Sequence, residues 1–197
     1  MKKQHNYKNY EDYKNHQLKK TSDKTKQKKW LGEEWRLKID IFKGLFNENI
    51  DHIKDKSKCI CLGSRTGQEV VAFKELGIID TIGIDLHEFK PYTIIGDIHD
   101  LKYEDNTFDL AFSNIFDHSL YPEKFISEIY RVLKPNGIFI LHIQYGVNQD
   151  KYTEIIIENI NQFKNLFSKF ELIKENKIKS GIIAMNYEYM FKKTYNI

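Results

Sequence analysis

Residues 58–77 read KCICLGSRTGQEVVAFKELG, and they combine three local signals. The apolar run Lys58–Leu62 predicts a buried strand, and the glycines that follow it predict a turn. The apolar pattern over Thr66–Leu76, closed by Gly77, predicts a helix. A strand, a glycine-containing turn and a helix in this order form a place where backbone N–H groups can approach an anionic or nucleotide-like ligand.

Strands and helices alternate along the rest of the chain. Further strands are expected at Thr81–Asp85, Thr93–Gly96, Phe108–Ser113, Ile138–Ile143, Phe170–Glu175 and Tyr187–Lys192, with helices at Trp30–Asn47, Pro122–Leu133 and Tyr152–Phe167. This order predicts a doubly wound α/β fold with a mixed seven-stranded sheet. No helix separates the last two strands, so they are expected to be antiparallel partners. The short link Leu86–Tyr92 is expected to have lost its crossover helix or to keep only a turn.

The chain changes character at Trp30. Residues 1–29 hold ten lysines against three acidic residues, a net charge of +7 in a chain whose net charge is +3. Because they show no apolar stripe, we expect a flexible Lys-rich tail, with contact to nucleic acid or to a membrane surface as the alternative. Residues 30–197 are expected to form one domain, in which the amphipathic helix within 30–50 lies as a lid over the ligand site.

Length and composition restrict the class of protein. A chain of 197 residues with 41% hydrophobic residues fits one globular domain. No apolar run approaches the ~20 residues that span a bilayer, and no apolar segment follows the charged start as in a secretory signal. Cys59 and Cys61 would share one face of a strand, where they cannot form a disulfide with each other. Buried thiols of this kind suit the cytoplasm.

Asp85 ends the strand that follows the glycine turn, 22 residues after Gly63. A carboxylate at that place can accept hydrogen bonds from both hydroxyls of a ribose. This pattern is common by chance, and it leaves a nicotinamide dinucleotide and S-adenosylmethionine equally open as the cofactor.

Five segments, in order, carry a resemblance that separates these cofactors. They are CLGSRTGQE (61–69), GIDL (83–86), GDIHDL (96–101), YEDNTFDLAFSN (103–114) and RVLKPNG (131–137). The run from Cys59 to Ile143 resembles the core of the class I methyltransferases, especially the type 11 family, and the segment 131–137 is the most specific match. The resemblance implies a Rossmann-like sheet, S-adenosyl-L-methionine as cofactor, and methyl transfer to an oxygen or nitrogen atom.

The resemblance also implies which residues hold the cofactor. Those implied around its methionine portion are Gly63, Ser64, Arg65 and Gly67. Those implied around its ribose and adenine are Asp85, Leu86, Asp97, Ile98 and the adjoining His99. The floor of the site near the cofactor's sulfonium is implied to consist of Ser113 and Asn114.

Two positions depart from the family pattern. The family usually has an acidic residue where Cys61 stands, and its loss removes a group that would contact the cofactor ammonium. The family usually has glycine where Arg65 stands. The Arg65 guanidinium either pairs with the methionine carboxylate of the cofactor or points into solvent from the turn.

His118 follows the fourth strand, where the methyl acceptor is expected to approach. It is a candidate general base, with Asp117 beside it to orient the ring. The alternative is a histidine that is hydrogen-bonded to the backbone of its own loop. The histidines and acids near the strand ends (His99, His118, His142, Asp97, Asp100 and Asp117) show no short metal-ligand spacing, so no metal site is predicted.

No insertion in the sequence is long enough to build a second substrate domain. The acceptor is therefore expected to be a small or medium-sized molecule, such as a sugar or another metabolite with a hydroxyl group. Two alternatives belong to other classes. One is a catalytically inactive S-adenosylmethionine-binding protein, which the departures at Cys61 and Arg65 would explain. The other is an RNA-modifying methyltransferase that the basic tail steers to its substrate.

Overall fold

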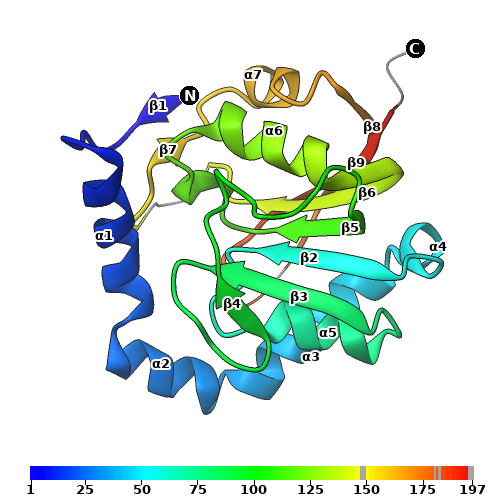
Figure 1. Ribbon diagram of the computed structural model, residues 1–197, viewed down its shortest axis with the longest axis horizontal. Helices are drawn as coiled ribbons and strands as arrows, with labels where there is room; N and C mark the ends of the chain where they lie inside the picture. The colour runs from blue at the N-terminus through cyan, green and yellow to red at the C-terminus, as the bar shows by residue number, and fades with distance from the viewer. Residues whose placement is uncertain (147–149, 180, 182, 195–197) are drawn as a thin grey trace.

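A single mixed sheet forms the centre of the protein (Figure 1). The computed structural model describes residues 1–146, 150–179, 181 and 183–194. The strands lie in the order β4 (Thr93–Ile95), β3 (Asp80–Asp85), β2 (Lys58–Leu62), β5 (Phe108–Ser113), β6 (Leu133–Ile143), β9 (Tyr187–Lys193) and β8 (Phe170–Lys177). All pairings are parallel except those of β9, which runs antiparallel to both neighbours. The predicted seven-stranded sheet with an antiparallel last pair is confirmed.

Helices cover both faces of the sheet, as doubly wound folds require. One face carries α6 (Pro122–Val132) and α7 (Ile160–Asn165), and the other carries α3 (Trp35–Asn47), α4 (Ile50–Ile53) and α5 (Gln68–Glu75). Figure 1 shows these two layers above and below the strands. No helix in the described part of the chain is long and apolar enough to cross a membrane.

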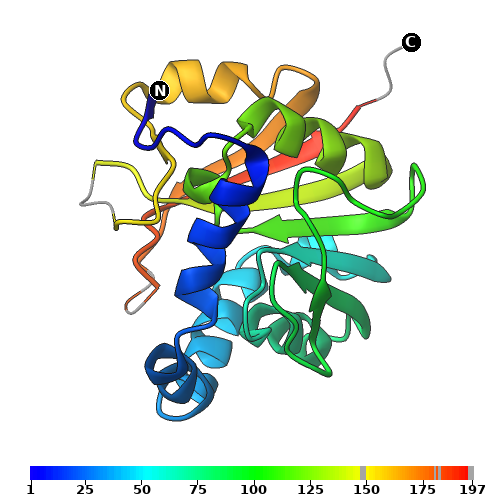
Figure 2. The same cartoon turned by 60° about the vertical axis from the view of Figure 1, so that its left-hand side comes forward.

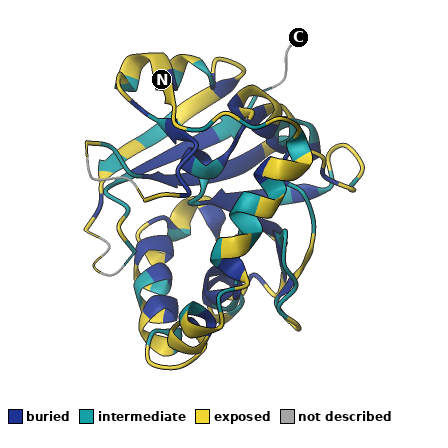
Figure 3. Ribbon diagram, turned by 90° about the vertical axis from the view of Figure 1, so that its left-hand side faces the viewer, coloured by how far each residue is buried: buried dark blue, intermediate teal, exposed yellow. Residues whose placement is uncertain are grey.

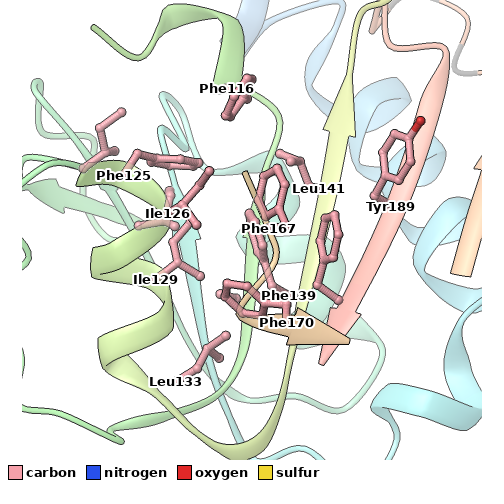
Figure 4. Close-up of a cluster of buried hydrophobic side chains, with 14 of the residues drawn as sticks. Phe116, Phe125, Ile126, Ile129, Leu133, Phe139, Leu141, Phe167, Phe170 and Tyr189 are labelled. Atoms are coloured by element: carbon pink, nitrogen blue, oxygen red, sulfur yellow. The ribbon is translucent and has the colours of Figure 1, made fainter. Parts of the chain in front are cut away.

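The alternation of side chains along the central strands divides the core into two clusters. Ile60 of β2 faces the α6 side, where Phe125 and Ile129 pack against Phe139 of β6 (Figure 4). Cys59 and Cys61 face the α5 side instead, and both are buried, free thiols. Their position on one face of the strand agrees with the sequence prediction.

The second cluster shows where the apolar stripe of α3 packs. Its fully buried Phe46 stacks on Phe73 of α5 with ring centroids 3.8 Å apart, and it meets Phe112 of β5 edge-on at 4.9 Å. Ile39 and Phe42 of the same helix are buried in this cluster too. The helix predicted as a lid within residues 30–50 thus packs its apolar stripe against the sheet, while its Lys38 and Phe42 line a small cavity beside the glycine turn.

The N-terminal residues are not an unstructured tail in this structure. They form β1 (Lys2–Lys3), α1 (Tyr10–Thr21) and α2 (Lys24–Leu31), with the side chains of Asn9 and Asp23 capping the two helices. The predicted domain boundary before Trp30 falls inside α2. In Figures 1 and 2, α1 stands across the edge of the sheet where the parallel strands end. Figure 3 shows the exposed and less exposed residues that alternate along it.

Two other segments differ from the prediction. The helix expected over Tyr152–Phe167 is wrong in its first half, where residues 155–156 form the short strand β7 and pair antiparallel with β1. Only α7 remains helical. Strand β6 begins at Leu133, five residues before the predicted start. The link Leu86–Tyr92 contains no helix, as expected, and β3 and β4 still pair in parallel.

Candidate functional site

A cavity of about 610 Å³ lies at the carboxyl ends of the parallel strands, beneath α1. Six residues that the sequence assigned to a cofactor line it: Gly63, Arg65, Asp85, Leu86, Asp97 and Ile98. They follow different strands, and the parallel sheet brings them to one edge. Four residues of α1, which the sequence analysis did not assign to the site, close the cavity from the other side: Tyr13, Gln17, Lys20 and Thr21. Their spacing of three and four residues is the signal that could have found them.

Asp85 is the half-buried carboxylate at the end of β3. It accepts hydrogen bonds from the backbone N–H groups of Arg65 at 3.0 Å and His87 at 3.3 Å. Burial raises the pKa of Asp85, and the bond from the Arg65 backbone counteracts that rise. Each carboxylate oxygen can accept a second hydrogen bond, so the group keeps capacity for ligand hydroxyls.

Asp97 is the second carboxylate of the cavity, and it is tied to α1. The Tyr10 hydroxyl lies 2.8 Å from each of its oxygens, and the backbone N–H of His99 donates to it at 2.8 Å. Burial alone would raise the pKa of Asp97, but the bonds from His99 and Tyr10 lower it to about 2. The carboxylate is therefore charged at neutral pH.

His99 does not line the cavity, although the sequence placed it there. It is buried behind Asp97, with Nδ1 2.7 Å from the Tyr10 hydroxyl and Nε2 2.7 Å from Ser119 Oγ. Four other assigned residues also lie outside this cavity wall, namely Ser64, Gly67, Ser113 and Asn114. Ser113 donates to the Leu62 carbonyl and Ser64 contacts Thr93, while Gly67 caps α5 with a φ of 87°. Ser64 and Gly67 shape the glycine turn between β2 and α5.

Further hydrogen bonds hold α1 in place over the cavity. The Tyr13 hydroxyl donates to the His118 carbonyl at 2.9 Å, and Gln17 Nε2 donates to the Tyr152 carbonyl at 2.9 Å. Lys20 forms an ion pair with Asp150 at 2.6 Å. The contacts between α1 and the domain are thus mostly polar, which is why the helix shows no apolar stripe.

Arg65 occupies a turn position that favours glycine. Its φ is 49°, in the left-handed region that costs an ordinary residue roughly 1–2 kcal/mol. Its guanidinium lies over the ring of Trp30, 4.3 Å from the ring centroid. Arg65 lines the main cavity and both neighbouring cavities described below.

A second cavity of about 790 Å³ opens beside the first and shares Lys20, Arg65, Ile115 and His118 with it. Asn114 and Asp117 belong to this second cavity, as does Gln144 at the end of β6. A third, smaller cavity of about 280 Å³ lies behind the glycine turn, between α3 and α5. Asn114 and Ser64 also line this third cavity.

The ring of His118 is oriented by Tyr152 rather than by Asp117. Its Nδ1 lies 2.8 Å from the Tyr152 carbonyl, which can only accept, so Nδ1 carries the proton. Its Nε2 then accepts from the ammonium of Lys20 at 3.2 Å. Asp117 Oδ2 is 3.8 Å from Nε2, too far for a hydrogen bond. The Tyr152 carbonyl, rather than Asp117, thus makes the hydrogen bond that fixes the ring, and Asp117 remains near Nε2.

The histidines that the sequence analysis weighed as metal ligands do not converge. His142 is buried in the core, where its Nε2 lies 2.9 Å from Glu188. Within the described ranges, no group of three or more His, Cys, Asp and Glu side chains is arranged to hold a metal ion.

The donor set of the main cavity fits an adenosine-containing cofactor. Two carboxylates suit hydroxyl and amino groups, and the apolar side chains of Leu86 and Ile98 suit the flat faces of a base. With this sheet order, the site defines a class I S-adenosylmethionine-dependent methyltransferase. The model of the methyltransferase domain family, type 11, matches residues 60–141 of this chain.

Solved structures share the fold at low sequence identity. A protein from Pyrococcus horikoshii OT3, PH0226, has 19% identity and a TM-score of 0.65 over 83% of this chain and 92% of its own. The 1,6-didemethyltoxoflavin-N1-methyltransferase from Burkholderia thailandensis has 13% identity and a TM-score of 0.74 over 98% and 93%. A putative methyltransferase in complex with Trm112 from Haloferax volcanii has 14% identity and a TM-score of 0.61 over 78% and 94%. No curated protein matches the sequence.

Proposed function

We propose that the protein transfers the methyl group to an oxygen or nitrogen of a small acceptor that binds in the second cavity. The observation that carries this proposal is the shared wall of the two large cavities. Arg65, Ile115 and His118 line both, so a molecule in one can reach a molecule in the other.

The cofactor would lie in the main cavity. Asp85 would accept hydrogen bonds from its ribose, while Asp97 and Ile98 would meet its adenine. S-adenosylmethionine supplies an electrophilic methyl group on a sulfonium. The chain would contribute mainly by holding the acceptor in line and by keeping water out, which α1 does as the roof of the cavity.

His118 is placed to take the proton that a hydroxyl acceptor loses. Its unprotonated Nε2 faces both cavities, and its protonated Nδ1 is fixed by the Tyr152 carbonyl. The ammonium of Lys20 now donates a hydrogen bond to Nε2 of His118. When an acceptor displaces this ammonium, the ammonium keeps Asp150 as its partner at 2.6 Å. The oxygen–hydrogen bond of the acceptor would break as its oxygen bonds to the methyl carbon, and the proton would pass to Nε2.

A small acceptor fits the size of the second cavity, about 790 Å³ including its open part. The Burkholderia thailandensis structure offers support from outside the chain. It was solved with bound 1,6-didemethyltoxoflavin and S-adenosylhomocysteine, and its fold overlaps 98% of this chain, residues of the N-terminal region included.

The proposal is tested by ligand binding and by a His118→Ala variant. S-adenosylhomocysteine should raise the melting temperature, whereas NAD should not. At a hundred times its dissociation constant, a ligand adds about 2.7 kcal/mol to the free energy of unfolding. With a panel of small hydroxyl and amine acceptors, His118→Ala should lower turnover of a hydroxyl acceptor by ~10²–10⁴-fold with unchanged cofactor affinity.

The matched control is His52→Ala, which removes an exposed histidine on α4, away from the cavities. It should keep the parent rate. A His118→Ala variant that also keeps most of its rate would exclude His118 as the base, and stabilisation by NAD alone would contradict the cofactor.

A further inference from the structure

Glu69 is a buried carboxyl group without an ion pair. It lies in the first turn of α5, is 4% exposed, and lines the third cavity together with Lys38, Arg65 and Asn114. Its own backbone N–H donates a hydrogen bond to it, but among the described residues no side chain donates to it or forms a salt bridge with it. A buried carboxylate in this condition is costly unless a cation reaches it.

The charged groups near Glu69 come from α3, from the glycine turn and from β3. Burial raises the pKa of Glu69 to about 7, the nearby cations Arg65 and Lys38 counteract the rise, and Asp85 of β3 adds to it. Lys38 is already paired with Glu34 at 2.6 Å, and Arg65 stacks on Trp30. Neither cation is bonded to Glu69, so the carboxyl is half protonated near neutral pH.

Cys61 lies within electrostatic reach of this carboxyl. Burial raises the pKa of the Cys61 thiol, and Glu69 raises it further, so the thiol is neutral. Position 61 is where the family usually has its acid. The structure therefore supplies an acidic side chain to the cavity next to the glycine turn from α5 instead of from β2.

We infer that Glu69 replaces the acid missing at position 61 and binds the ammonium group of the cofactor's methionine portion in the third cavity. The groups around this cavity suit an amino acid zwitterion. The carboxyl of Glu69 and the side-chain carbonyl of Asn114 are acceptors for an ammonium, while Arg65 and Lys38 are donors for a carboxylate. The inference rests on S-adenosylmethionine being the cofactor.

Binding of a protonated ammonium must ionise Glu69. An α-ammonium keeps its proton at pH 6, since its pKa is roughly 8. A carboxyl with a pKa of about 7 is mostly neutral at that pH, so the complex forms with release of its proton to the buffer. The released proton is a signature that a merely structural Glu69 would not give.

Calorimetry with two ligands tests the inference. S-adenosylhomocysteine carries the amino acid portion, and 5′-methylthioadenosine lacks it. Glu69→Gln should weaken S-adenosylhomocysteine binding by roughly 10- to 100-fold, the range of a charge-assisted hydrogen bond, and methylthioadenosine binding less than about twofold. Glu75→Gln, the same change on the same helix but paired with Arg36 outside the cavity, should change neither affinity.

Proton release is measured by repeating the titration at pH 6 in two buffers that differ in ionisation enthalpy. The unmodified protein should release close to one proton with S-adenosylhomocysteine and none with methylthioadenosine, and Glu69→Gln should abolish the release. If Glu69→Gln does not fold, proton release by the unmodified protein still tests the role of Glu69.

The outcomes separate the inference from the proposed function. Equal losses for both ligands in Glu69→Gln, or no proton release in the unmodified protein, would overturn the role of Glu69 alone. Failure of both ligands to bind the unmodified protein would overturn the cofactor itself.

Discussion

Helices α1 and α3 differ from their sequence predictions in opposite ways. The sequence of α3 shows a strong apolar stripe, and it predicted a lid over the ligand site. The sequence of α1 shows almost none, and it predicted a flexible tail. In the structure α3 is a core helix against β5 and α5, and α1 covers the main cavity.

This difference teaches what an apolar stripe measures. It reports how much surface a helix must remove from water, and the largest such surface available is a sheet face. A helix that covers a polar ligand cavity contacts carboxylates, carbonyls and imidazoles instead. Tyr10, Tyr13 and Gln17 make these contacts through hydroxyl and amide groups, so the covering helix looks like a solvated segment in the sequence.

The largest effect that tests this comparison is expected in α3. Phe46→Ala should lower the free energy of unfolding by about 3–5 kcal/mol, because it removes a fully buried ring between Phe73 and Phe112. Leu37→Ala, at a 50% exposed position of the same helix, is the control and should cost far less. Urea denaturation gives both values. A small loss for Phe46→Ala would show that α3 is not a core helix.

Removal of α1 should act on binding more than on folding. A chain lacking residues 1–22 should bind S-adenosylhomocysteine roughly 10- to 100-fold more weakly, because one wall of the main cavity is replaced by water. Calorimetry measures the affinity, and circular dichroism checks that the sheet remains folded. Unchanged affinity would show that α1 does not close the site, and global unfolding would place α1 in the core.

The smallest effect is expected from a single hydroxyl. Tyr10→Phe removes the bond to Asp97 and should speed hydrogen exchange of the α1 amides by about 5- to 10-fold, roughly 1 kcal/mol, with the α3 amides unchanged. Tyr121→Phe is the matched control, because that ring stacks on Tyr10 but its hydroxyl takes no part in this bond. Equal exchange in both variants would mean that the hydroxyl does not hold the helix.

The sheet could be predicted because its signals are local. Each strand from Lys58 to Ile143 carries its own apolar run, and turns such as the one at 63–67 separate strands from helices. Asp85 and Asp97 could be assigned because they follow strands directly. These features depend on residues within about ten positions of one another.

The remaining features depend on contacts between distant segments. The apolar residues of 152–157 fit a helix, yet this segment pairs with β1, some 150 residues earlier in the chain. Glu69 reads as an ordinary polar residue at a helix start, and only the fold buries it beside Cys61. Arg65 has the left-handed backbone conformation that favours glycine, and the spacing of residues in the sequence does not reveal this.

The pairing of β1 with β7 attaches α1 at its N-terminal end, and α2 attaches it at the other. Lys2 and Lys3 join Ile156 and Ile155, the Gln4 N–H donates to the Glu154 carbonyl at 2.9 Å, and α2 continues into the domain at the other end. A helix held in this way cannot swing free on one hinge. Exchange of spent cofactor for fresh cofactor must wait until one attachment opens. The residence time of S-adenosylhomocysteine, and with it the maximal turnover rate, should therefore be governed by the opening of a two-residue strand pair.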